Sequence, residues 1–257
     1  MQQKYFNNIV KRLLKNKNKI ITSEKIKNLV SNILEDEFTP KKSYKILYHL
    51  KNKGYLIPLK KDIFFVKLPS QETTQEEIID KFYRDILRNH CREKLDYAWY
   101  VWWLKACQLN AWDFSVPEEI EIINPHKQAR ETILTWKYWN FRKYTGKDIN
   151  IFNKLKKLTN KTKIWKYTIS FSNLELSILE SLYNIDDITW NFNIEFIKRI
   201  IRKYKKKLNY ENFDYITKLG KHQTSINRLY KISKSIDPNI SENIKKIIKK
   251  NSYFLDL

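Results

Sequence analysis

The sequence has little glycine, and its glycines are scattered. Only three occur in 257 residues, Gly54, Gly146 and Gly220, and none lies near another. The phosphate-binding loop of nucleotide hydrolases and the dinucleotide-binding fingerprint each need several glycines close together, because the backbone must approach phosphate closely there. Both motifs are excluded, and with them most enzymes that use a nucleotide cofactor.

Cysteine and long apolar runs are also scarce. Cys91 and Cys107 are the only cysteines and show no CxxC spacing, which excludes a disulfide framework and a zinc ribbon and favours a reducing compartment. No run approaches 18 apolar residues, and the N-terminal segment lacks the apolar stretch of a signal peptide. The sequence therefore predicts a cytoplasmic protein without a membrane partner.

Aromatic residues, in contrast, are abundant. Hydrophobic residues make up 42% of the sequence and aromatic residues 14%, including eight tryptophans and sixteen tyrosines. This much apolar surface is atypical of a disordered chain, so the protein is expected to fold. The length suits one large domain or two small ones.

Positive charge is concentrated at both ends of the chain, whose formal net charge is +22. Residues 1–69 carry 16 basic and 5 acidic side chains, residues 70–190 carry 18 and 17, and residues 191–257 carry 16 and 6. An A+T-rich genome would enrich lysine, which supplies 41 of the 50 basic residues, but would spread it evenly. The uneven distribution favours a polyanionic partner, with nucleic acid preferred over an anionic membrane.

Two amphipathic helices are predicted in the first 35 residues. Apolar residues recur at helical spacing over residues 4–15. A second helix follows a short basic turn and begins at Thr22 or Ser23, either of which can cap it. Ile26 and Val30 lie on its buried side.

A third helix is predicted from Pro40 to about Lys53. A proline suits the first helical position because its missing N–H has no partner there. Ile46, Leu47 and Leu50 are its inward positions. The opposite face is basic and rich in hydrogen-bond donors, and it consists of Lys41, Lys42, Lys45, Tyr48, His49 and Asn52.

Two short β-prone runs follow, in the sequence YLIPLKKDIFFVKL, and predict a hairpin with a polar tip. Three helices and then a hairpin are the order of a winged helix-turn-helix domain, here residues 1–69. In that fold the third helix enters the major groove and the wing lies against phosphates. The predicted DNA-binding residues are therefore the six on the basic helix face together with Lys60 and Lys61. A winged helix used only for protein contacts, or a solvated lysine face, is the alternative.

Residues 70–257 are predicted to form a mixed α+β domain that ends in a basic helical bundle. A polar break over residues 70–76 precedes a helix over about 76–90. Aromatic and apolar residues then recur at helical spacing and predict one more helix, on Tyr97, Tyr100, Trp103, Leu104 and Cys107.

Alternating patterns further along predict three strands, over residues 118–125, 133–144 and 163–171. Ser172 and Glu175 have the spacing of a capping box at the start of the next helix. The remaining sequence is helical in pattern from Phe192, with breaks at Gly220 and at Asp237-Pro238.

No catalytic or metal-binding constellation is evident. His90, Cys91 and Cys107 are the only metal-like grouping. A zinc site needs four N or S ligands, or three with a water, but these residues lie in or beside aromatic helical stripes, which favours packing over metal binding. Acidic clusters occur at residues 35–37, 118–121 and 186–187. Carboxylates of a metal-dependent nuclease converge on a divalent cation, but the residues directly after Glu121 are Ile-Ile-Asn and not the lysine of a PD-(D/E)xK-type nuclease. The sequence predicts no catalytic residue, no metal and no cofactor.

The order of these segments resembles a known family. The wing LIPLKKDIFFVKL, the aromatic segment DYAWYVWWLKACQLNAW, the strand EEIEIINP, the segment KYTISFSNLELSILESLYN and the late helix SINRLYKISKSI together look like the AbiEi-type antitoxins. These are the transcriptional-regulator half of type IV abortive-infection toxin–antitoxin pairs. The resemblance implies a DNA-binding protein that represses its own operon and counteracts a nucleotidyltransferase-like toxin encoded nearby. The alternatives are a plasmid or mobile-element replication initiator and, less favoured, a metal-dependent nuclease.

Overall fold

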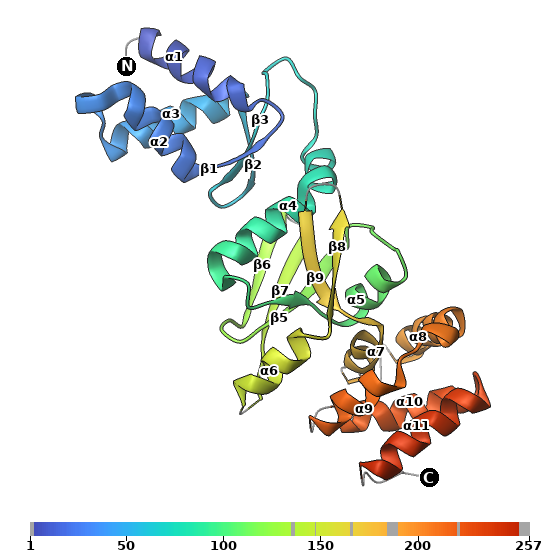
Figure 1. Ribbon diagram of the computed structural model, residues 1–257. Helices are drawn as coiled ribbons and strands as arrows, with labels where there is room; N and C mark the ends of the chain where they lie inside the picture. The colour runs from blue at the N-terminus through green and yellow to red at the C-terminus, as the bar shows by residue number, and fades with distance from the viewer. Residues whose placement is uncertain are drawn as a thin grey trace. The chain divides into compact units, whose positions relative to one another are not determined.

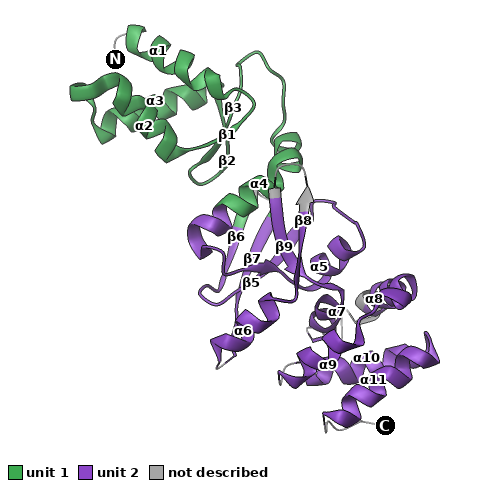
Figure 2. Ribbon diagram, viewed as in Figure 1, with its two compact units in different colours: residues 1–89, 132–137 green, residues 90–131, 138–257 purple. Residues whose placement is uncertain are grey.

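The computed structural model contains helices and two β-sheets, which confirms the mixed α+β class (Figure 1). It describes residues 3–134, 137–146, 148–164, 167–183, 190–219 and 222–251. The chain divides into two compact units, residues 1–89 with 132–137 and residues 90–131 with 138–257 (Figure 2). The predicted boundary between residues 69 and 70 stays a prediction.

The three N-terminal helices occupy the predicted places. They are α1 (Gln3–Leu13), α2 (Ser23–Leu34) and α3 (Pro40–Asn52), with short 3₁₀ turns at Leu14–Asn16 and Glu35–Glu37. Thr22 caps α2 and Thr39 caps α3, because each side chain accepts a hydrogen bond from the backbone N–H three residues later. After α3, Gly54 has a φ of 75°, which a residue with a side chain adopts only with strain.

A three-stranded antiparallel sheet completes this part of the chain. The predicted hairpin consists of β2 (Leu56–Lys60) and β3 (Ile63–Val66), and β3 is the central strand. The third strand, β1 (Ile20–Thr22), lies where the sequence indicated only a basic turn. Three residues are too short for an alternating pattern to show, so only pairing with β3 defines this strand. Apolar residues of the helices and sheet form one core, including Phe6, Ile9, Leu13, Ile26, Val30, Ile46, Leu50, Phe64 and Val66.

The long helix α4 (Gln75–Leu95) follows the polar break. It begins at a capping box, since Glu77 N–H donates to the Thr74 hydroxyl and Thr74 N–H donates to the Glu77 carboxylate. The predicted helix over 76–90 is therefore correct in kind but five residues too short at its C-terminal end.

A six-stranded mixed sheet follows, in the order β6-β7-β5-β4-β9-β8. Its strands are β4 (Tyr100–Val101), β5 (Glu119–Asn124), β6 (Ala129–Leu134), β7 (Lys137–Lys143), β8 (Thr159–Ile164) and β9 (Tyr167–Ser172). The strand predicted at 118–125 is confirmed. The single strands predicted at 133–144 and 163–171 are wrong, because each range joins the end of one strand to most or all of the next strand. Residues 135–136 and 165–166 lie outside the described residues.

The predicted aromatic helix is also wrong in part. Tyr97 is exposed and Tyr100 lies in β4, and only α5 (Trp103–Asn110) is helical. The helical spacing of these rings was misleading, since Tyr100 is buried by the sheet, where it pairs with Ile123 of β5. The helix α6 (Ile149–Lys156) connects β7 to β8.

The C-terminal part is helical, as the pattern predicted, and its described residues, 174–183, 190–219 and 222–251, contain five α-helices. They are α7 (Leu174–Tyr183), α8 (Trp190–Tyr204), α9 (Tyr210–Lys218), α10 (Gln223–Lys234) and α11 (Pro238–Lys250), with a 3₁₀ turn at Lys205–Lys207. The predicted break at Asp237-Pro238 is present, because α11 begins there with Asp237 as its cap, whereas the predicted break at Gly220 lies outside the described residues. Apolar residues of all five helices share one core.

The capping box predicted at Ser172 and Glu175 is wrong. Asn173 caps α7 instead, because its side chain accepts the N–H of Leu176. Ser172 and Glu175 are both buried and serve tertiary contacts. The Glu175 carboxylate accepts the backbone N–H of Asn209, at the start of α9, at 2.9 Å. A buried carboxylate needs such donors, and these tie α7 to α9.

Candidate nucleic-acid interface

The basic helix face predicted from the sequence lies on the solvent side of α3. Ser43, Ile46 and Leu50 are buried on its other side. The exposed residues include all six that were predicted, namely Lys41, Lys42, Lys45, Tyr48, His49 and Asn52. Three cations within five residues make this face attractive to a polyanion.

One neighbouring acidic residue weakens this charge. Lys42 Nζ lies 3.3 Å from a carboxylate oxygen of Glu37. Both side chains are about half exposed, so the pair is worth little and can open for another partner. Within the described part of the chain, Lys41 and Lys45 have no ion-pair partner.

The tip of the hairpin holds the other two predicted residues. Lys61 is exposed and Lys60 is partly exposed. Between the strands, Asp62 has a φ of 64°, and its carboxylate accepts a hydrogen bond from the Ser23 hydroxyl at 2.8 Å. Ser23 N–H also donates to the Asp62 carbonyl oxygen. These hydrogen bonds attach the tip to the start of α2, so the backbone that carries Lys60 and Lys61 is held in one conformation.

Sequence reasoning overlooked one prominent residue of α3. Tyr44 is 60% exposed, as much as Tyr48 at 57%. The ammonium group of Lys27, on α2, lies 5.2 Å from the centre of the Tyr44 ring, within the range of a cation–π contact. The four-residue spacing of the two tyrosines was the signal available in the sequence, because it places them on one helix face.

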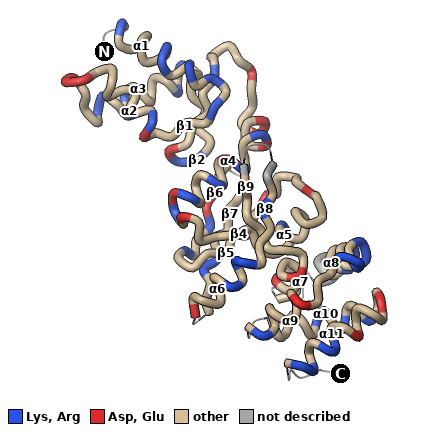
Figure 3. Tube along the Cα trace, viewed as in Figure 1, with Lys and Arg blue, Asp and Glu red and all other residues tan. Residues whose placement is uncertain are grey.

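A second group of exposed cations lies on the C-terminal helices. Lysine and arginine residues gather along α8 (Figure 3). The exposed basic side chains of α8 and of the 3₁₀ turn that follows it include Arg199, Arg202, Lys203, Lys206 and Lys207. Lys205 in the same turn pairs with Asp237 at 3.1 Å. The second basic region expected from the charge count is thus present as a surface.

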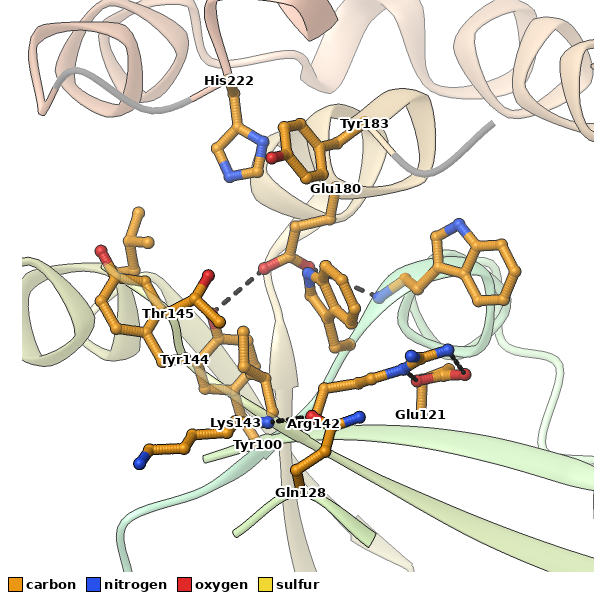
Figure 4. A pocket seen from close by; sticks show the side chains of 14 residues that line it. Tyr100, Glu121, Gln128, Arg142, Lys143, Tyr144, Thr145, Glu180, Tyr183 and His222 are labelled. Carbon is orange, nitrogen blue, oxygen red and sulfur yellow. Dashed lines mark hydrogen bonds and ion pairs between the residues drawn. The ribbon is translucent and has the colours of Figure 1, made fainter. Parts of the chain in front are cut away.

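The second unit also contains a cavity of about 470 Å³ between the sheet and α7 (Figure 4). Tyr100, Arg142 and Tyr144 line it from the sheet side, and Glu180 and Tyr183 line it from α7. The Arg142 guanidinium is held by Glu121, with 2.9 Å between Nε and the carboxylate oxygen.

Glu180 is fully buried at this cavity. Its carboxyl group accepts hydrogen bonds from the Tyr100 hydroxyl at 3.1 Å, from Ser172 and, at 3.5 Å, from the Trp103 N–H. Burial raises the pKa of Glu180 to about 8, although these hydrogen bonds favour the charged form. No local sequence pattern indicates this group, because the partners of Glu180 come from separate segments of the chain.

We expect Glu180 to make the stability of the protein depend on pH. Between about pH 4.5 and 8 the folded protein holds a proton that the unfolded chain has released, so the free energy of unfolding falls as the pH rises. Glu180→Gln removes this titration. By pH 8 the free energy of unfolding of the wild type is expected to have fallen by roughly 3 to 5 kcal/mol through this group, whereas that of the variant should not fall in this way. Chemical denaturation at several pH values measures the difference.

The control for that experiment is Glu93→Gln, at an exposed position of α4. This variant should follow the wild-type pH curve. If Glu180→Gln also follows it, the carboxyl group of Glu180 does not titrate as inferred.

The candidate metal-binding clusters noted in the sequence do not form a metal site among the described residues. Among the described residues, no three His, Cys, Asp or Glu side chains are placed to hold a metal ion. His90 lies 3.0 Å from Glu131, and burial raises the pKa of the Cys107 thiol to about 11, which makes it a poor ligand. Of the acidic clusters, 35–37 forms a 3₁₀ turn, Glu119 and Glu121 face arginines, and 186–187 lies outside the described residues.

Comparisons with known proteins extend the description of the fold. No family model matches the sequence, and no curated protein matches it. Among solved structures, the crystal structure of the RV2827C protein from Mycobacterium tuberculosis is similar, with a TM-score of 0.62 and 10% sequence identity over 97% of this chain and 82% of that one. At this identity the likeness shows a shared fold over nearly the whole chain. In the part of the chain that the structure describes, no helix combines the length and apolar character needed to cross a membrane.

Proposed function

We propose that residues 1–69 form a winged helix-turn-helix domain that binds double-stranded DNA. The observation that carries the proposal is the exposed face of α3, where Lys41, Lys42 and Lys45 lie opposite the side that buries Ile46 and Leu50. The order helix, strand, helix, helix and hairpin supports it, since this is the order of that domain class. In such a domain α3 is the recognition helix and the β2–β3 hairpin is the wing.

The two basic elements have different tasks in this proposal. An α-helix fits the major groove of B-DNA, where side chains reach both base edges and the flanking phosphates. The hairpin tip is narrow and carries Lys60 and Lys61 beside one carboxylate, Asp62, which already binds Ser23. Its lysines therefore suit the phosphate backbone, which positions a protein without reading sequence.

Replacing Lys60 and Lys61 by alanine is expected to change the salt dependence of DNA binding. Each phosphate that a lysine neutralises contributes about −0.9 to the slope of log K against log salt. The double variant should therefore have a slope shallower by about one to two. Fluorescence anisotropy with a labelled duplex at several salt concentrations measures this slope.

A matched control removes two exposed lysines from α1 and the turn after it. Lys4 and Lys15 are both exposed, and Lys4→Ala with Lys15→Ala lowers the net charge by the same amount. Equal slopes for the wing variant and the wild type would show that the hairpin tip does not touch DNA. Equal effects of the two double variants would show that only net charge matters.

At the level of the whole protein, we propose a transcriptional regulator and antitoxin that represses its own operon and counteracts a nucleotidyltransferase-like toxin. The order of elements resembles the AbiEi-type antitoxins, and the division of the chain into two compact units supports a protein with two separate tasks. The neighbouring gene is the first test. A nucleotidyltransferase-like reading frame supports the antitoxin, an iterated origin supports a replication initiator, and Mg²⁺-dependent DNA cutting supports a nuclease.

A further inference from the structure

Two aromatic rings stand exposed in the middle of the basic face of α3. Tyr44 is 60% exposed and Tyr48 is 57% exposed, although large apolar side chains are ordinarily buried. They are four residues apart, so they lie on one face, about 6 Å apart along the helix axis. Lys41 and Lys45, both exposed, lie beside them.

The position of the Tyr44 ring is partly fixed before any partner binds. Lys27 of α2 lies 5.2 Å from the ring centre, and such a cation–π contact restricts the ring and occupies one of its faces. Tyr48 contacts the ring of His49 edge-on, with 5.9 Å between the ring centres. Rings restricted in this way lose less conformational entropy when they contact a partner.

The charge around the rings selects the partner. An apolar patch surrounded by lysines suits a polyanion that also offers apolar groups. In the major groove of DNA that group is the C5-methyl of thymine, which cytosine lacks. Successive bases rise by about 3.4 Å, so two side chains about 6 Å apart along a helix reach bases about two steps apart.

We propose that Tyr44 and Tyr48 read thymine methyl groups in the major groove, so that the DNA bound by α3 carries two thymines about two base steps apart. This inference rests on the proposed function, because it requires α3 to enter the groove. It adds the chemical feature of the DNA that the helix selects.

The alternative is that the two tyrosines contact DNA through their phenolic hydroxyl groups, and the experiment must distinguish this from recognition of methyl groups by the rings. Tyrosine hydroxyls also donate to phosphate oxygens, which carry no sequence information. Replacing both tyrosines by phenylalanine keeps the rings and removes the hydroxyls. Replacing both by serine removes the rings. The quantity that separates the two readings is the ratio of affinities for thymine and for deoxyuridine, which lacks only the methyl group.

The experiment uses the intact protein. Duplexes are selected from a random-sequence library, and each thymine of the selected site is then replaced in turn by deoxyuridine. At two positions, about two steps apart, the substitution is expected to weaken binding about fourfold, the equivalent of about 0.8 kcal/mol for burying one methyl-sized group. The phenylalanine variant should keep this ratio, and the serine variant should bring it close to one.

Three results would overturn the inference. The first is a wild type that binds every deoxyuridine duplex as tightly as its thymine counterpart, and the second is a serine variant that keeps the fourfold ratio. In either case duplex binding itself, and with it the proposed function, would stand. Failure to enrich any duplex would overturn the proposed function as well. Tyr215→Ser, at an exposed tyrosine of α9, is the control and should leave the ratio unchanged.

Discussion

Replacing Lys41, Lys42 and Lys45 together by alanine is expected to weaken the binding of double-stranded DNA about a hundredfold. This value assumes about 1 kcal/mol for each hydrogen bond between a lysine and a phosphate, with less from Lys42 because Glu37 holds it. The melting temperature should hardly change, since substitutions of solvated surface residues usually stay within about 0.5 kcal/mol each. Titration of a labelled duplex, run beside thermal unfolding, measures both quantities.

The control for the triple variant removes the same charge from another face. Lys4, Lys11 and Lys15 are exposed on α1 and the turn that follows it. Their replacement by alanine lowers the net charge equally, so any general attraction to DNA falls equally in both variants. If the two triple variants bind DNA alike, or if the α3 variant binds as the wild type does, α3 is not the recognition helix.

The second large effect concerns protection against a toxin, which is expected to be separable from DNA binding. In the full-length protein, the triple lysine variant should lose repression of its own operon and keep protection. Residues 70–257 alone should protect as well, because α4 retains its Thr74–Glu77 capping box in this fragment. Residues 1–69 alone should retain weaker DNA binding, supported by their own core.

Growth of cells in which the neighbouring gene is induced measures protection, and a band-shift assay on each protein measures DNA binding. The expected result is growth with the triple variant and with residues 70–257, but not with residues 1–69. Growth restored by residues 1–69 alone would place protection in the DNA-binding part. The proposed division of tasks would then be wrong.

Local signals made much of the N-terminal part predictable. Thr39 and Pro40 define the start of α3 through contacts made within one helical turn. Gly54 marks the end of the helix, because it adopts a positive φ there. The strand β1 was missed because its evidence is non-local, since Ile20 and Ile21 become a strand by pairing with β3. The exposed side of α3 followed from its helical period, and the same period places Tyr44 beside Tyr48, although only Tyr48 was predicted on that face.

The second unit was harder to predict because its contacts join distant segments. Ser172 and Glu175 match a capping box in sequence, yet Asn173 is also a good cap and lies one residue closer to the helix. Glu175 instead accepts a hydrogen bond from Asn209, which lies 34 residues later in the sequence. Likewise, no local pattern indicates that Glu180 meets Tyr100 across 80 residues.

Lysine acetylation of the intact protein, with and without a bound duplex, tests most directly whether α3 and the hairpin form the DNA-binding surface. The account predicts that DNA protects Lys41, Lys45, Lys60 and Lys61 from the reagent, while Lys4 and Lys15 react as before. Mass spectrometry of the digested protein identifies each modified lysine. Protection confined to the C-terminal cations, such as Lys203, Lys206 and Lys207, with α3 and the hairpin still reactive, would contradict the account.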